Sequence, residues 1–153
     1  MKYLMFFENF EEHSILFNEI KLRKFIESIK TSDQDVETIF QNLKSKIEEY
    51  QSLPQIVTLY RLIAAPNKDT IRTDNLGKHY FLHPSNITDD FLNSISISRH
   101  EKIFLVEIQI SKNKINFDRT IQQNIIFPNE DEIFTSEFVT QSNIKSISEI
   151  MTK

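Results

Sequence analysis

The 153-residue chain has no cysteine, no tryptophan and a single glycine, Gly77. Without cysteine it can form no disulfide, no thiolate zinc site and no cysteine nucleophile. One glycine is too few for a glycine-rich phosphate loop, and the Gly-x-Ser-x-Gly turn of hydrolases is absent. The four histidines show no metal-ligand spacing, so we predict no metal site. The candidate chemistry therefore rests on arginine, histidine, tyrosine and glutamate side chains.

Long apolar runs are also missing. The apolar run at the N-terminus ends at Phe7 and turns acidic at once, which is too short for the core of a signal peptide. No stretch approaches the roughly 18 apolar residues of a transmembrane helix. The formal net charge of −4 gives no general attraction to nucleic acid or to anionic membranes. We therefore expect a cytoplasmic protein, of its own cell or of a host cell, with no nucleic-acid or membrane partner.

The overall composition is that of a soluble globular protein, with 39% hydrophobic and 26% charged residues. A chain of this length forms one domain in most proteins. The bias toward isoleucine, asparagine and lysine is typical of an AT-rich genome, such as that of a phage or a low-GC bacterium. We predict a single α+β domain over 1–153, with a helical part at 1–53 and a strand-rich part at 54–153.

Hydrophobic periodicity places the expected elements. Apolar residues at three- and four-residue steps predict amphipathic helices over 10–29 and 36–50. β-branched and aromatic runs predict five strands, over 55–65, 78–82, 102–110, 132–140 and 144–151. Short helices are expected over 71–76 and 85–95, whereas 116–126 is predicted to be a loop with at most a helical turn.

Arg61 is the first candidate for a functional residue. It lies within "TLYRLI", in a predicted strand whose two faces are both mostly apolar, so the strand is expected to be central and largely buried. A buried guanidinium needs an anionic partner, because an unpaired buried charge is costly. That partner is either a carboxylate of the protein or a ligand phosphate, which the planar fork of arginine donors fits.

The second and third candidates are "LGKHYFLHP" and "FPNEDEI". In the first, Gly77 permits a positive φ and close approach of another group, while His79 and Tyr80 offer flat rings with polar tips. A turn glycine before a half-buried strand would give the same pattern without any ligand. In the second, strand alternation directs Glu130 and Glu132 to one side and Asp131 to the other. An acidic, solvated turn is the simpler interpretation of this segment.

The order of these features resembles the ADP-ribosyltransferase superfamily, which splits NAD and transfers ADP-ribose. The resemblance covers roughly residues 56–139. It rests on "LYR" at 59–61, "LGKHYFLHP" at 76–84, "IFLVEIQI" at 103–110 and "FPNEDEI" at 127–133. It implies a mixed, split β-sheet core after the helices, and a mono-ADP-ribosyltransferase that uses NAD as its substrate and a protein as its acceptor.

The resemblance also implies roles for single residues. Arg61 would bind the NAD phosphates, and His79 and Tyr80 would take the place of the nicotinamide-side motif. Glu132 would be the essential glutamate, which stabilises the positive charge that develops as nicotinamide leaves. Glu130 would steer or deprotonate the acceptor, and a glutamate there usually accompanies arginine acceptors in this superfamily.

The chain combines features of two branches of the superfamily. One branch carries Ser-Thr-Ser where this chain has His79, Tyr80 and Phe81, and the other carries histidine where Arg61 stands. Beside an active transferase, two alternatives stay open. One is a non-catalytic member that retains the fold as a binding module, and the other is an unrelated small α+β module that binds or inhibits another protein.

Overall fold

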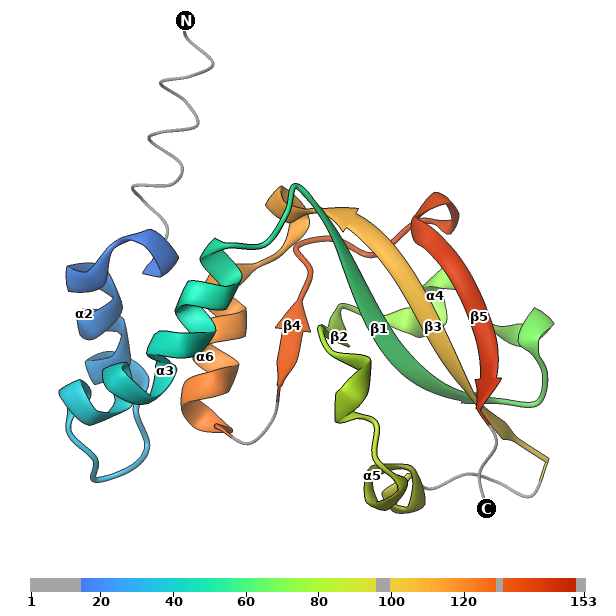
Figure 1. The fold of residues 1–153 in the computed structure, drawn as a ribbon, viewed down its shortest axis with the longest axis horizontal. Helices are drawn as coiled ribbons and strands as arrows, with labels where there is room; N and C mark the ends of the chain where they lie inside the picture. The colour runs from blue at the N-terminus through green and yellow to red at the C-terminus, as the bar shows by residue number, and fades with distance from the viewer. Residues whose placement is uncertain (1–14, 96–99, 129–130, 151–153) are drawn as a thin grey trace, which may run out of the picture. The chain divides into compact units, whose positions relative to one another are not determined.

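The computed structural model describes residues 15–95, 100–128 and 131–150 (Figure 1). The chain forms two compact units, each built from two separate segments. A helical unit comprises Met1–Pro54 and Asn116–Glu132, and a sheet unit comprises Gln55–Ile115 and Ile133–Lys153. The predicted mixed α+β class is confirmed. The helical unit includes residues 116–132, a segment that we expected in the strand-rich part.

The helical unit contains the 3₁₀ turn η1 (Ile15–Phe17) and the helices α2 (Glu19–Ile29), α3 (Val36–Gln51) and α6 (Phe117–Ile126). Polar side chains cap all three α-helices: Asn18, Asp35 and Asn116 each accept a hydrogen bond from the backbone N–H three residues later. The second predicted helix is confirmed. The first begins at Glu19, and residues 10–14 of its predicted range lie outside the described residues.

Helix α6 corrects the sequence prediction, because residues 116–126 were expected to form a loop. Its buried residues are Thr120, Ile121 and Asn124, two of which are polar. The sequence pattern of this helix is not clearly amphipathic, since a buried asparagine interrupts the apolar stripe. Asn124 is compatible with burial because its Nδ2 donates to the Tyr50 hydroxyl at 3.1 Å and to the Thr120 carbonyl at 2.9 Å.

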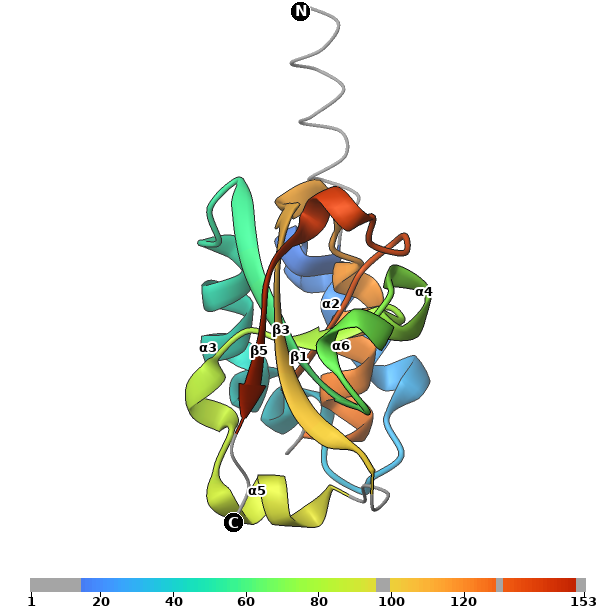
Figure 2. The same ribbon diagram turned by 90° about the vertical axis from the view of Figure 1, so that its right-hand side faces the viewer.

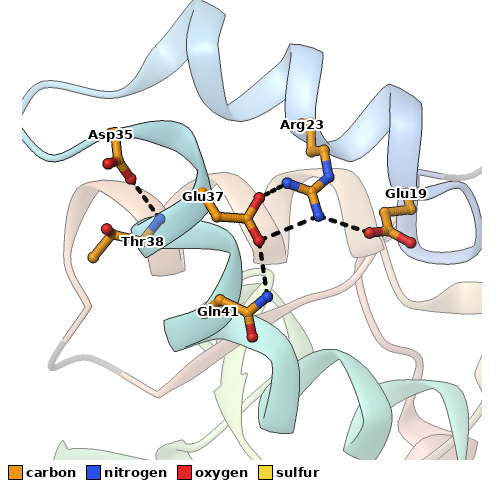
Figure 3. A network of polar contacts seen from close by, with 6 residues as sticks. All are labelled: Glu19, Arg23, Asp35, Glu37, Thr38 and Gln41. Carbon is orange, nitrogen blue, oxygen red and sulfur yellow. Dashed lines mark hydrogen bonds and ion pairs between the residues drawn. The ribbon is translucent and has the colours of Figure 1, made fainter.

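A polar network on the surface of the helical unit joins α2 to α3 (Figure 3). Arg23 lies between two carboxylates: its Nη2 is 2.7 Å from Glu19, and its guanidinium also donates to Glu37. Gln41 donates to the same Glu37 at 2.9 Å. The Arg23 guanidinium covers the ring of Phe40 at 4.2 Å. Since exposed ion pairs contribute only about 0–1 kcal/mol each, the network orients the two helices more than it stabilises them.

The sheet unit contains a five-stranded sheet of order β4-β2-β1-β3-β5. The strands are β1 (Ile56–Ala65), β2 (His79–Phe81), β3 (Lys102–Ser111), β4 (Glu132–Phe134) and β5 (Ile144–Ile150). The β1–β2, β1–β3 and β3–β5 pairs are antiparallel. Figures 1 and 2 show β1, β3 and β5 as three long strands side by side. The segments that connect these strands along the chain contain two short helices, α4 (Thr73–Leu76) and α5 (Asp89–Ser94). They also contain four 3₁₀ turns: η2 (Lys68–Thr70), η3 (Pro84–Asn86), η4 (Lys112–Lys114) and η5 (Gln141–Asn143).

The two faces of the long strands differ in burial. On one face, Val57 and Leu59 of β1 pair with Ile110 and Ile108 of β3, and all four are buried. The residues of the opposite face are mostly half-buried. The central position that we predicted for β1 is confirmed, because β1 lies between β2 and β3.

The strand predicted over 132–140 is much shorter in the structure, where β4 ends at Phe134. Side chains and backbone beyond it form other bonds. The Thr135 hydroxyl donates to the Glu137 carbonyl at 2.7 Å, and the Ser136 N–H donates to the Lys114 carbonyl at 2.7 Å. One bond is local and the other joins the segment before α6, and both take the place of a regular ladder, so the alternating pattern does not continue as a strand.

Candidate functional site

The middle of β1 positions Arg61. It lies on the same face as the buried Val57 and Leu59, yet its side chain is only half-buried. Its Nη1 donates to the backbone carbonyl of His79 on the neighbouring strand, at 3.0 Å. The guanidinium is therefore held by a carbonyl of the protein, which was not one of the two partners proposed from the sequence.

Gly77 lies directly against this guanidinium. A Cβ atom at position 77 would be 3.2 Å from Nη1 of Arg61, a tight contact. Gly77 also ends α4 with φ +69° and ψ −155°, a backbone region that essentially only glycine occupies. The sequence singled out Gly77 because glycine permits a positive φ and the close approach of another group. The structure shows both at this position.

Tyr80 and His79 occupy opposite environments although they are adjacent in β2. The Tyr80 side chain is 2% exposed, and its hydroxyl donates to the Gly77 carbonyl at 3.1 Å. Burial raises the pKa of Tyr80 to about 12, although the positive charge of Arg61 acts in the opposite direction. His79 is exposed, and its ring lies 6.0 Å from that of Phe134. Of this pair, only His79 presents its ring to solvent.

The acidic segment contributes residues to the helical unit. Glu132 is half-buried and begins β4, and it belongs to the helical unit, whereas Arg61, His79 and Tyr80 belong to the sheet unit. Glu130 lies outside the described residues. Asp131, which alternation directs away from Glu132, lies 3.8 Å from the ammonium group of Lys46 on α3. The structure thus brings together Arg61, His79 and Tyr80, with Gly77 as an additional member of the cluster.

A shallow pocket of about 280 Å³ in the sheet unit was not indicated by any motif. Its lining comes from the end of β3, from η4 and from the segment after β4, so no single stretch of sequence reveals it. Two of its polar lining groups, Lys114 and Glu137, are 3.2 Å apart, and a third, Asn143, donates to the Gln109 carbonyl at 3.1 Å. The Lys78 ammonium lies 4.6 Å above the ring of Phe138. These polar and charged groups at the pocket therefore have partners within the protein, and we assign the pocket no ligand.

Two further findings concern what the described residues do not contain. No three histidine, aspartate or glutamate side chains gather there as ligands of a metal ion. The helices of residues 15–95, 100–128 and 131–150 are all too short or too polar to cross a membrane.

Comparison with known proteins gives no match: no protein-family model fits the chain, and neither a curated protein nor a solved structure is significantly similar to it.

Proposed function

We propose that the protein is a mono-ADP-ribosyltransferase, which splits NAD and transfers ADP-ribose to a protein acceptor. The observation that carries this proposal is the strand order. Arg61 is on β1, His79 and Tyr80 are on β2, and Glu132 begins β4, and these strands are consecutive neighbours in the order β4-β2-β1. The three motifs are far apart in the sequence, yet the strands that carry them are neighbours in the sheet, which supports a split sheet of the ADP-ribosyltransferase type.

In the proposed reaction the bond between nicotinamide and C1 of the ribose breaks, and nicotinamide leaves with the bonding electron pair. Positive charge then develops on the ribose, and the Glu132 carboxylate stabilises it while holding a ribose hydroxyl. A nucleophilic atom of the acceptor, a guanidine nitrogen where the acceptor is arginine, forms the new bond to C1. Glu130 takes the proton that this atom loses.

Arg61 binds the phosphates of NAD in this proposal. Its guanidinium carries five N–H donors in a planar fork, a geometry that fits phosphate oxygens, and Nη1 donates to the His79 carbonyl. The same bond fixes the orientation of the side chain before NAD arrives. His79, with its exposed ring, faces the nicotinamide side.

A second candidate is a binding module of the same fold that performs no transfer. The burial of Tyr80 favours it, because a side chain that is 2% exposed and bonded to Gly77 acts within the protein. In that case Arg61 and Tyr80 together stabilise the turn at Gly77, and NAD or a protein binds without reacting.

Labelled NAD separates these candidates. The protein is incubated with labelled NAD and candidate acceptor proteins, and label on protein is measured for the wild type, Glu132→Gln and Glu137→Gln. We expect Glu132→Gln to lower transfer by about 100-fold or more, the scale of losing one electrostatic stabiliser of a transition state. The matched control Glu137→Gln changes an exposed glutamate that pairs with Lys114 and should keep the wild-type rate. Equal transfer by the wild type and Glu132→Gln refutes the role of Glu132, and NAD binding without transfer supports the binding module.

A further inference from the structure

Strand β5 is an edge strand of the sheet. It is the last strand in the order β4-β2-β1-β3-β5, and β3 is its neighbour (Figures 1 and 2). Within the part of the chain that the structure describes, the Ile144 N–H donates to the Gln141 carbonyl, and the other backbone hydrogen bonds of Ile144–Ile150 are those to β3. The outer N–H and C=O groups of such a strand are a template on which another strand can pair.

The sequence of β5, "IKSISEI", is symmetric about Ile147. Ser146 and Ser148 flank this centre, and Ile144 and Ile150 end the strand. The two remaining residues, Lys145 and Glu149, are equally far from Ile147 and carry opposite charges. If two copies of β5 pair antiparallel about Ile147, each isoleucine and serine faces a residue of its own kind, and each lysine faces a glutamate.

We propose that β5 is the contact between two copies of this chain, paired antiparallel about Ile147 so that one sheet runs through both subunits. A two-fold axis through this pair makes the contact self-complementary, which is the commonest form of a homodimer interface. The charge pair occurs twice, because Lys145 of each copy lies opposite Glu149 of the other. Opposite charges at facing positions stabilise a strand pair, and like charges destabilise it.

The surroundings of Lys145 among the described residues are compatible with this contact. Lys145 is exposed, forms no ion pair among the described residues, and faces no residue of β3, because the register shifts between Glu107 and Ile108. Glu149 is also exposed, and it lies 3.4 Å from Lys102 within its own subunit. A single seven-residue strand gives a small interface, so the dimer should be weak and should form in a concentration-dependent way.

Charge reversal tests both the dimer and its register. Sedimentation velocity over a wide concentration range measures the dimer dissociation constant of the wild type, Lys145→Glu, Glu149→Lys and the double reversal. Each single reversal places like charges opposite each other twice, so we expect about tenfold weaker association or more. The double reversal restores both pairs and should return the constant to within about threefold of the wild type. Unchanged thermal unfolding of the variants confirms that they fold.

A cysteine cross-link locates the axis, since the chain has no cysteine of its own. At a two-fold axis the Cα atoms of position 147 in the two copies would be about 4.5–5.5 Å apart, within the range of a disulfide. Ile147→Cys should therefore cross-link to itself on oxidation, whereas Ser45→Cys, on the exposed side of α3, should not. If Ile147→Cys fails to fold, a mixture of Ser146→Cys and Ser148→Cys proteins, both exposed positions, should give the mixed disulfide.

Three results overturn the proposal. The first is a protein that stays monomeric at every concentration. The second is a dimer that tolerates both single charge reversals, because its contact then lies elsewhere. The third is a dimer of folded protein in which neither cysteine arrangement cross-links faster than the Ser45→Cys control.

Discussion

At the scale of single residues, Gly77 shows how one position can carry two constraints. Its φ of +69° with ψ −155° excludes residues with a side chain, and a Cβ atom would press on Nη1 of Arg61 at 3.2 Å. We predict that Gly77→Ala lowers the free energy of unfolding by about 1–3 kcal/mol, the usual cost of backbone strain at such a site. Urea denaturation measures this, with Ser45→Ala on the exposed side of α3 as the control. A loss no larger than that of the control would mean that the turn adapts without cost.

The raised pKa of Tyr80 predicts a dependence of stability on pH. The unfolded state ionises near pH 10, while burial keeps the folded tyrosine neutral up to about 12. The unfolded state therefore binds fewer protons in this window, so the free energy of unfolding falls as pH rises from about 10 toward 12. Tyr80→Phe removes this part of the dependence, while its lost hydroxyl bond to Gly77 costs about 0.5–1.5 kcal/mol at neutral pH.

The measurement is urea denaturation of both proteins at about pH 8 and about pH 11. Wild type should lose about 1 kcal/mol more than Tyr80→Phe between these conditions. Burial also raises the pKa of Tyr50, but Tyr50 is present in both proteins and its effect cancels in the comparison. Parallel losses in the two proteins would show that Tyr80 ionises in the folded state as readily as in the unfolded state.

At the scale of elements, Asn124 links α6 to α3. It is 1% exposed, it donates to the Tyr50 hydroxyl, and its Oδ1 accepts from Lys46 at 2.9 Å. We predict that Asn124→Ala costs about 1–3 kcal/mol, because the buried partner groups lose their bonds. Gln122→Ala, at an exposed position of the same helix, should change stability by less than about 0.5 kcal/mol.

A double-mutant cycle with Tyr50→Phe identifies the cause. The combined variant should lose less stability than the sum of the two single variants, because both remove the same hydrogen bond. Strict additivity would mean that the bond between Asn124 and Tyr50 contributes nothing to the cost of Asn124→Ala. Thermal unfolding followed by circular dichroism is sufficient to measure all four proteins.

Elements with a continuous apolar pattern were predictable from the sequence. Helix α3, strand β1 and strand β3 follow their predicted ranges closely, because one apolar face or two define each of them. Helix α6 was not predictable in this way, since the partner that makes Asn124 acceptable in its interior is Tyr50, far away in the sequence. The early end of β4 has a similar cause: the bonds of Thr135 and Ser136 involve Glu137 and Lys114, and alternation contains no information about them.

The candidate site was predictable in part: the sequence placed its residues on strands, but it did not predict their contacts. Spacing placed Arg61, His79 and Tyr80 on strands, and the structure brings these strands together. The opposite burial of His79 and Tyr80 follows from strand alternation, but which of the two points inward depends on the packing of the sheet unit. The bond from Arg61 to a backbone carbonyl could not be read from residue types, because every residue carries the same carbonyl group.

At the scale of the whole molecule, both units are assembled from segments that are distant in the sequence. The helical unit needs Asn116–Glu132 in addition to Met1–Pro54. Residues of α2 and α3 such as Ile26 and Tyr50 are completely buried, and α6 supplies the buried Ile121 and the partner of the Tyr50 hydroxyl. A fragment of residues 1–54 therefore lacks part of its core, and chains below about 60 residues are only marginally stable even when complete.

We predict that the fragment 1–54 has low helix content by itself and gains helix when a peptide of residues 116–132 is added. The gain arises because the peptide covers the apolar faces of α2 and α3 and restores the Asn124 bond to Tyr50. Far-ultraviolet circular dichroism measures it as an excess over the sum of the separate spectra. The same peptide with Ile121→Asp is the control, since Ile121 is fully buried and a charge there should abolish the gain. A fragment that melts cooperatively without the peptide would show that residues 1–54 fold alone, and the pairing with α6 would then add only stability.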